Sequence, residues 1–184
     1  MMIKKILFLI LFGATTFVQA QVGTEFPAME GESLTNEFVN LPDDIKGKYT
    51  IIGLAYSKKA EEYLKSWFKP AYYQFLHKPD KPSVFQITFD VNLYFVPMFT
   101  GAKRPAYKSV MKKVKETIDK DLQPYVLFYK GELHLYKEVL KFEDKKTPYF
   151  YVLDPEGKII YVTKGRYSDS KMQEIVDYVA DAMD

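Results

Sequence analysis

The stretch TPYFYVLDPEGKI, residues 147–159, carries the clearest structural pattern in the chain. Residues 149–153 form an apolar run of strand length, and residues 158–163 form a second run rich in β-branched side chains. The four residues between them, DPEG (154–157), are types that favour a tight turn. The stretch therefore predicts a β-hairpin near the end of the chain.

Strands and helices are predicted to alternate on the N-terminal side of this hairpin. The run YTIIGLA, residues 49–55, is apolar almost throughout, which is typical of a strand buried on both faces. A helical pattern follows over residues 60–75, and Pro70 inside it is expected to kink the helix. Residues 85–95 alternate strictly between apolar and polar side chains, which predicts a half-buried strand bounded by Pro97 and Gly101.

The remaining segments complete the expected architecture. A hairpin is expected within residues 26–40, a second helix from Pro105, a further strand at 124–129 and a short helix at 132–140. The last helix is expected to begin near Ser170, where a capping-box pattern stands. Strands separated by helices, followed by a closing hairpin and helix, predict an α/β domain: a central mixed β-sheet with helices on both faces.

Residues 1–20 are predicted to be a signal peptide. Two lysines precede the apolar run 6–12, and a small-residue cleavage pattern ends at Ala20. The alternative is an uncleaved membrane anchor, but the apolar run is shorter than the roughly 20 residues that span a bilayer. We therefore expect an exported protein, periplasmic or extracellular. Its residues 21–184 form a single domain with no stable membrane insertion after cleavage.

The charge of the chain argues against nucleic-acid binding. The net charge of the whole chain is +2 at pH 7, and Lys4 and Lys5 of the predicted signal peptide account for both charges. Acidic and basic residues are interspersed along the rest, without the basic cluster that a phosphate backbone requires. We therefore expect no nucleic-acid partner.

The order of these elements resembles the thioredoxin-like superfamily. GKYTII (47–52) is similar to the start of the first core strand in that superfamily, and residues 147–159 resemble its TP-x-x-x-v-l-D-x-x-G-k-I pattern. SK (57–58), SW (66–67) and KP (69–70) are also similar to the thioredoxin-like assembly factor of mitochondrial ATP synthase. The resemblance implies a thioredoxin-like domain over most of the mature chain.

The chain contains no cysteine, although redox members of this superfamily work through a pair of cysteines. The resemblance places these two cysteine positions near Lys59 and Glu62, at the start of the helix after the first core strand. Because the thiolate is the species that attacks a disulfide or a peroxide, thiol–disulfide oxidoreductase and thiol peroxidase activity are excluded.

The resemblance also implies where a ligand would bind. In the superfamily the proline of the TP pair is cis and lines the substrate groove, so we expect a cis bond between Thr147 and Pro148. The groove would lie between this bond and the turn after the first core strand. The predicted binding residues are Tyr56, Ser57, Lys58, Lys59, Thr147 and Pro148.

No catalytic residue, metal site or cofactor is predicted. His77 and His134 are far apart and neither stands in metal-ligand spacing. Nucleophile-elbow and glycine-rich phosphate motifs are also missing from the sequence. The first functional hypothesis is an exported non-redox protein that binds another protein or peptide, as an assembly or chaperone-type factor. The alternative is a cysteine-independent enzyme of unknown reaction that uses the same groove.

Overall fold

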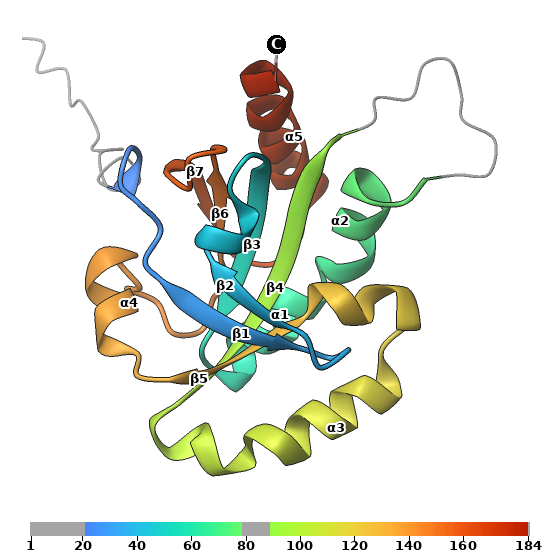
Figure 1. Cartoon of the computed structure of the whole chain (residues 1–184), viewed down its shortest axis with the longest axis vertical. Helices are drawn as coiled ribbons and strands as arrows, with labels where there is room; N and C mark the ends of the chain where they lie inside the picture. The colour runs from blue at the N-terminus through green and yellow to red at the C-terminus, as the bar shows by residue number, and fades with distance from the viewer. Residues whose placement is uncertain (1–20, 79–88, 184) are drawn as a thin grey trace, which may run out of the picture.

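The computed structural model describes residues 21–78 and 89–183. The predicted signal peptide and the first residues of the strand expected at 85–95 lie outside these ranges. A seven-stranded sheet in the order β2-β1-β5-β4-β3-β6-β7 forms the centre of the molecule (Figure 1). None of the described helices is both long and apolar enough to cross a membrane.

The sheet is built around β3 (Tyr49–Ala55), which confirms the strand predicted there. β3 pairs in parallel with β4 (Val91–Thr100) and antiparallel with β6 (Tyr149–Leu153). β6 pairs antiparallel with β7 (Ile159–Lys164), which confirms the predicted terminal hairpin. Because β3 has a strand on either side and packed layers over both faces, its residues are buried almost throughout.

An N-terminal hairpin widens the sheet, as the sequence predicts. β1 (Met29–Ser33) and β2 (Phe38–Leu41) pair antiparallel. β1 also pairs antiparallel with β5 (Leu127–Gly131), and β5 lies parallel to β4. β5 starts later than the strand predicted at 124–129, because Lys120–Tyr125 form the 3₁₀ helix η4.

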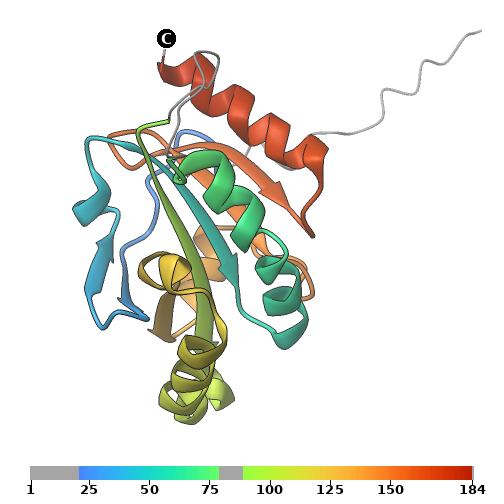
Figure 2. The same ribbon diagram turned by 90° about the vertical axis from the view of Figure 1, so that its right-hand side faces the viewer.

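Helices cover both faces of the sheet, which confirms the predicted layers. One face is covered by α1 (Lys58–Lys65), α2 (Phe68–Phe75), α3 (Tyr107–Thr117) and α5 (Asp169–Met183). The 3₁₀ helix η3 (Gly101–Ala106) leads into α3. The other face is covered by α4 (His134–Val139) and the 3₁₀ helix η2 (Asp43–Ile45). Figures 1 and 2 show α4 on the opposite side of the sheet from α1 and α2.

Two aromatic-rich cores lie on the two faces of the sheet. Ile51 belongs to the core beneath α1, α2, α3 and α5, and its neighbour Ile52 belongs to the core beneath α4. Each fully buried large side chain stabilises the fold by about 1.5–3 kcal/mol. The larger core contains Trp67, Phe68, Phe95, Phe99, Phe128 and Phe150. The other contains Phe26, Tyr56, Tyr129, Tyr136, Tyr149 and Tyr151.

Two prolines show how the strand and helix patterns differ from the structure. Pro97 was expected to bound its strand, but β4 continues through it to Thr100. The position is tolerated because Pro97 is the last residue of β4 that pairs with β3, and pairing with β5 begins at Met98. The helical pattern over 60–75 is interrupted before Pro70, which becomes the third residue of α2. A missing N–H breaks no intrahelical hydrogen bond in this first turn.

The N-terminus of α5 lies slightly earlier than predicted. α5 begins at Asp169, and the hydroxyl of Ser168 accepts a hydrogen bond from the backbone N–H of Lys171 at 3.4 Å. Ser168, rather than Ser170, therefore caps this helix.

Candidate functional site

Tyr56 directly follows β3, and its side chain packs in the core instead of facing solvent. Its side chain is 8% exposed, and its ring stacks on Phe142 with the centroids 5.1 Å apart. Burial raises the pKa of the Tyr56 phenol to about 12, and the neighbouring Tyr149 and Asp144 contribute to the same shift. Tyr56 is therefore a neutral, packed aromatic at physiological pH.

Ser57 connects the two halves of the predicted site. Its hydroxyl accepts a hydrogen bond from the backbone N–H of Ala60 at 3.1 Å, which caps α1. The same hydroxyl donates to the backbone carbonyl of Lys145. Because Lys145 lies two residues before Thr147, this contact brings the turn beside the Thr147–Pro148 segment, as the resemblance predicts.

Lys58 and Lys59 are exposed in the first turn of α1. The ammonium of Lys59 lies 3.2 Å from the carboxylate of Glu62 and 4.5 Å from the ring centre of Tyr63. The hydrogen bond to Glu62 raises the pKa of Lys59. The two residues near which the resemblance places the cysteine pair are thus joined by an ion pair.

The expected cis bond before Pro148 is wrong. Among the described residues the cis peptide bond is at Leu41–Pro42, and the Thr147–Pro148 bond is trans. Pro148 lies immediately before β6, where proline removes no ladder hydrogen bond and needs no cis geometry to fit. Its carbonyl accepts a hydrogen bond from the backbone N–H of Gly165 at 2.9 Å, so this polar group is already engaged.

The predicted site is therefore only partly accessible. Tyr56 and Pro148 are buried, whereas Ser57 and Thr147 are half-buried and the two lysines are exposed. The Thr147–Pro148 bond also lacks the cis geometry on which the expected groove was based. Ligand binding by the six residues stays a prediction.

A groove lies next to the turn formed by residues 56–59, between α1 and the η3–α3 segment. Its volume is about 690 Å³, and Phe99 of β4 forms part of its floor. Val110 and Val114, one helical turn apart on α3, line it from one side. Below them an apolar recess of about 50 Å³ reaches Leu64 and other core residues. The groove thus continues into the apolar core.

The groove extends along α3 toward η4. A section of about 390 Å³ shares Lys65, Val114 and Thr117 with the main part. Phe68 and Ile118 line this section together with these shared residues. The result is an elongated depression along the length of α3.

Charged side chains border the apolar floor. Lys103 lies 2.9 Å from Glu61 and also donates to the backbone carbonyl of Tyr56 at 3.1 Å. The groove is also lined by Lys58, Lys65, Lys113 and Glu62. Lys58 therefore belongs both to the predicted site and to this groove.

Sequence reasoning missed the α3 side of the groove. The spacing of Val110, Val114 and Ile118 is typical of the buried face of a helix, but all three residues are only half-buried. The fully buried residues of α3 are Tyr107 and Met111. The spacing identifies an apolar face of the helix, but it does not show that part of this face has no packing partner.

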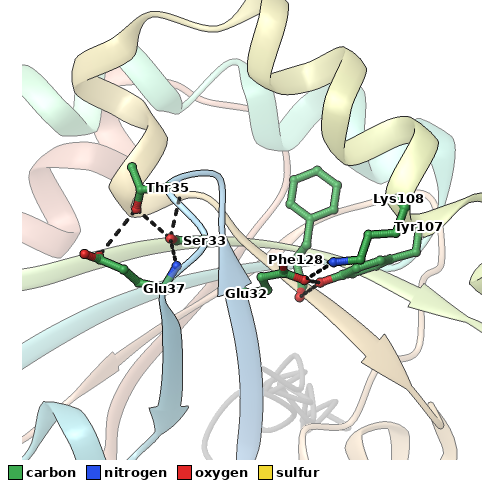
Figure 3. Close-up of polar contacts among 7 residues, drawn as sticks. All are labelled: Glu32, Ser33, Thr35, Glu37, Tyr107, Lys108 and Phe128. Atoms are coloured by element: carbon green, nitrogen blue, oxygen red, sulfur yellow. Dashed lines mark hydrogen bonds and ion pairs between the residues drawn. The ribbon is translucent and has the colours of Figure 1, made fainter.

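A polar cluster joins α3 to β1 (Figure 3). Glu32 is 8% exposed, and its carboxylate accepts hydrogen bonds from the Tyr107 hydroxyl at 2.6 Å and from Lys108 at 2.8 Å. Burial acts to raise the pKa of Glu32, but the hydrogen bonds from Lys108 and Tyr107 outweigh it, so the net pKa is lowered. The donors of this carboxylate come from within the fold, which is typical of a structural contact.

A third depression, of about 340 Å³, lies between β7 and α5 and contains Gln21. Gln21 is 5% exposed and donates from Nε2 to the carbonyl of Leu140 at 3.0 Å. Its Oε1 has no hydrogen-bond partner among the described residues. The first described residue is thus anchored in the fold.

Solved structures with the same fold share little sequence with this chain. BsSco, a member of the Sco family of cytochrome c oxidase assembly proteins, matches with a TM-score of 0.56 and 11% identity, covering 89% of this chain and 94% of that one. The conserved protein BF1870 of unknown function from Bacteroides fragilis matches with a TM-score of 0.52 and 11% identity, covering 85% and 99%. The exposed lipoprotein thioredoxin Etrx1 from Streptococcus pneumoniae matches with a TM-score of 0.50 and 14% identity, covering 83% and 99%. These similarities show a thioredoxin-like fold.

No curated protein matches the chain. The family model described as ATP10 protein matches residues 10–181, which is nearly the whole sequence. This match agrees with the predicted resemblance to an ATP synthase assembly factor. The chain belongs to the ATP10 protein family of ATP synthase assembly factors.

Proposed function

We propose that the protein is exported and acts as a non-redox assembly factor that binds a polypeptide. The observation that carries this proposal is the α1–α3 groove, whose apolar floor and charged borders lie beside the turn that holds the cysteine pair in redox relatives. Apolar grooves of this kind commonly accept a segment of another protein. Membership in a family of assembly factors supports a polypeptide as the ligand.

A non-redox role follows from the composition of the chain. It has no thiol to form a mixed disulfide, and Lys59 and Glu62 form an ion pair at the corresponding positions. Binding to a partner would therefore be non-covalent and reversible.

Export is supported by the sequence pattern of residues 1–20. An exported assembly factor would meet its partner outside the cytoplasm, at or near a membrane surface. By analogy with the family, the partner we propose is a subunit of an ATP synthase. This subunit would be held before it joins the complex.

Deletion of the gene combined with site-specific cross-linking tests the proposal. We expect loss of the protein to reduce the amount of assembled ATP synthase on native gels, and the wild-type gene to restore it. A photoreactive residue in place of Lys113, inside the groove, should cross-link to an ATP synthase subunit. The same residue in place of Lys112 or Lys115, which are exposed on α3 outside the groove, is the matched control. Normal assembly in the deletion strain, together with no cross-link to a subunit, would overturn the proposal.

A further inference from the structure

We infer that the α1–α3 groove binds an amphipathic helix of the partner polypeptide, with apolar residues along one face and acidic residues on both flanks. This inference rests on the proposed function and specifies the chemistry of the bound segment. It is carried by the shape of the groove, by the groups that line it and by its charge.

The floor of the groove calls for apolar side chains. Val110 and Val114 are half-buried, and the recess beneath them is lined by Leu64, Phe99 and other core residues. Covering this surface with apolar side chains would remove its apolar area from water, which favours binding. Apolar residues spaced by three or four positions would follow the floor along α3.

The walls of the groove favour a helical ligand over an extended one. α1 and the α3 segment form the two walls, and backbone groups within a helix are already hydrogen-bonded to each other. An extended peptide would find no strand edge with which to pair its backbone N–H and C=O groups. A helix satisfies these groups itself and presents only side chains to the groove.

The charges at the borders favour acidic flanks. Within the described part of the chain, Lys58, Lys65 and Lys113 form no ion pair, although all three line the groove. The two lining acids are already paired, Glu61 with Lys103 and Glu62 with Lys59. The unpaired charge around the floor is therefore positive, and carboxylates on the ligand would complement it.

Within the described part of the chain, α5 is the acidic amphipathic helix that a second copy would have to offer, and it is not free to do so. α5 carries several acidic residues, but Met172, Ile175 and Val179 on its apolar face are buried in its own core. Presenting that face to another copy would require α5 to leave its domain. A different polypeptide is therefore the occupant that fits.

Binding of synthetic peptides to the purified protein, followed by fluorescence anisotropy, tests the inference. The probe is an amphipathic peptide of about 15 residues, long enough to form a helix, with leucines on one face and glutamates on its flanks. One control replaces the glutamates by lysines, and a second rearranges the same residues without amphipathic order. We expect the acidic probe to bind roughly tenfold more tightly than either control, and binding to weaken as salt is added.

Variants of the protein locate the binding surface. The triple variant K58Q/K65Q/K113Q should weaken binding of the acidic probe roughly tenfold, which corresponds to about 1.4 kcal/mol. Its matched control, K112Q/K115Q/K146Q, changes three exposed lysines that do not line the groove and should bind normally. Val114→Gln should also weaken binding, whereas Val176→Gln, at a half-buried valine of α5, should not.

The outcomes separate the inference from the proposed function. Equal binding of the acidic and basic peptides, or equal loss in the two triple variants, would overturn the inference, even if the cross-link to an ATP synthase subunit is observed. Self-association that is lost in the Val114→Gln variant would also overturn it in favour of a second copy. Specific binding of the acidic probe, together with normal assembly in the deletion strain and no cross-link to a subunit, would support the groove and reject the proposed function.

Discussion

The hydroxyl of Tyr107 donates a hydrogen bond to the carboxylate of Glu32 at 2.6 Å, across the boundary between α3 and β1. Lys108 donates to both oxygens of the same carboxylate, at 2.8 and 3.0 Å. α3 thereby gains a polar attachment to the N-terminal hairpin in addition to its apolar contacts. This attachment holds the helix that forms one wall of the groove.

Glu32→Gln should destabilise the protein by about 1.5–3 kcal/mol, because it removes the charge from hydrogen bonds at a nearly buried site. Chemical denaturation measures the loss. Asp90→Asn is the matched control, since it breaks an ion pair with Lys48 whose two side chains are 75% and 49% exposed. Its cost should be only about 0–1 kcal/mol. Similar losses in the two variants would contradict the structural role of Glu32.

The contribution of Glu32 should depend on pH in a defined direction. Its pKa in the folded protein lies below the ordinary value of 4.5, so folding favours the ionised carboxylate. The stabilisation is complete above the unfolded-state pKa and is lost as the pH falls through the folded-state pKa. The free-energy difference between wild type and Glu32→Gln should therefore shrink as the pH falls below 4.5 and stay constant from there to neutral pH. A difference that grows on acidification would contradict this assignment.

Introducing two cysteines at the start of α1 should give the protein the disulfide chemistry that the wild type lacks. The wild-type protein should show no insulin reduction, disulfide isomerisation or thiol peroxidase turnover. The double variant K59C/E62C should form an internal disulfide, because the two positions are one helical turn apart at the N-terminus of α1, where a thiolate is stabilised. Thiol titration and mass spectrometry follow its formation. The variant K112C/K115C, with the same spacing within α3, should remain reduced under the same conditions.

Ser57→Ala should lower the free energy of unfolding by about 0.5–2 kcal/mol, the usual cost of losing a helix N-cap. It should also release the segment that contains Lys145, because the hydroxyl donates to that carbonyl. Limited proteolysis should then cut the variant within residues 141–146 faster than it cuts the wild type. Ser109→Ala provides a control on α3, where the hydroxyl bonds only to the backbone of its own helix segment. Unchanged proteolysis of Ser57→Ala would show that the hydroxyl does not hold the two halves together.

We predict that cleavage of the proposed signal peptide leaves Gln21 at the N-terminus. The side-chain amide of Gln21 is buried and donates to the carbonyl of Leu140, which restrains it from reacting with the newly formed amino group. Mass spectrometry should find the uncyclised N-terminus in the folded protein, and loss of ammonia only after denaturation. A mature chain that still begins at Met1 would contradict the predicted cleavage.

The elements that were predicted correctly are those whose structure follows from a local pattern of residues. The apolar run 49–55 and the turn residues 154–157 are both local patterns. The run forms β3 and the turn joins β6 to β7, as the sequence predicts. The alternation also predicts β4, but it does not show where the strand ends. β4 continues past Pro97 because pairing with β3 stops at this residue and pairing with β5 begins at the next one. Local patterns do not contain that information.

The candidate site was harder to predict for the same reason. The resemblance placed Ser57 beside the segment before Thr147, and the contact between Ser57 and Lys145 agrees with this placement. The geometry of the Thr147–Pro148 bond could not be inferred from residue type alone, because proline is tolerated at a strand start in either form. The groove along α3 depends on how far Val114 lies from its neighbours, which only the three-dimensional packing determines.

The position of β1 between β2 and β5 affects the order in which the chain can fold. β1 is made early, yet its pairing partner Phe128 is made only after most of the sheet. Until then the hairpin has no strand to join, and β4 has an open edge where β5 will lie. A chain released before β5 would therefore leave the edges of β1 and β4 that face β5 unpaired, and open strand edges promote aggregation. β5 pairs with both β1 and β4, so its completion covers both of these edges. The N-terminal hairpin is therefore secured by a segment that lies far along the chain.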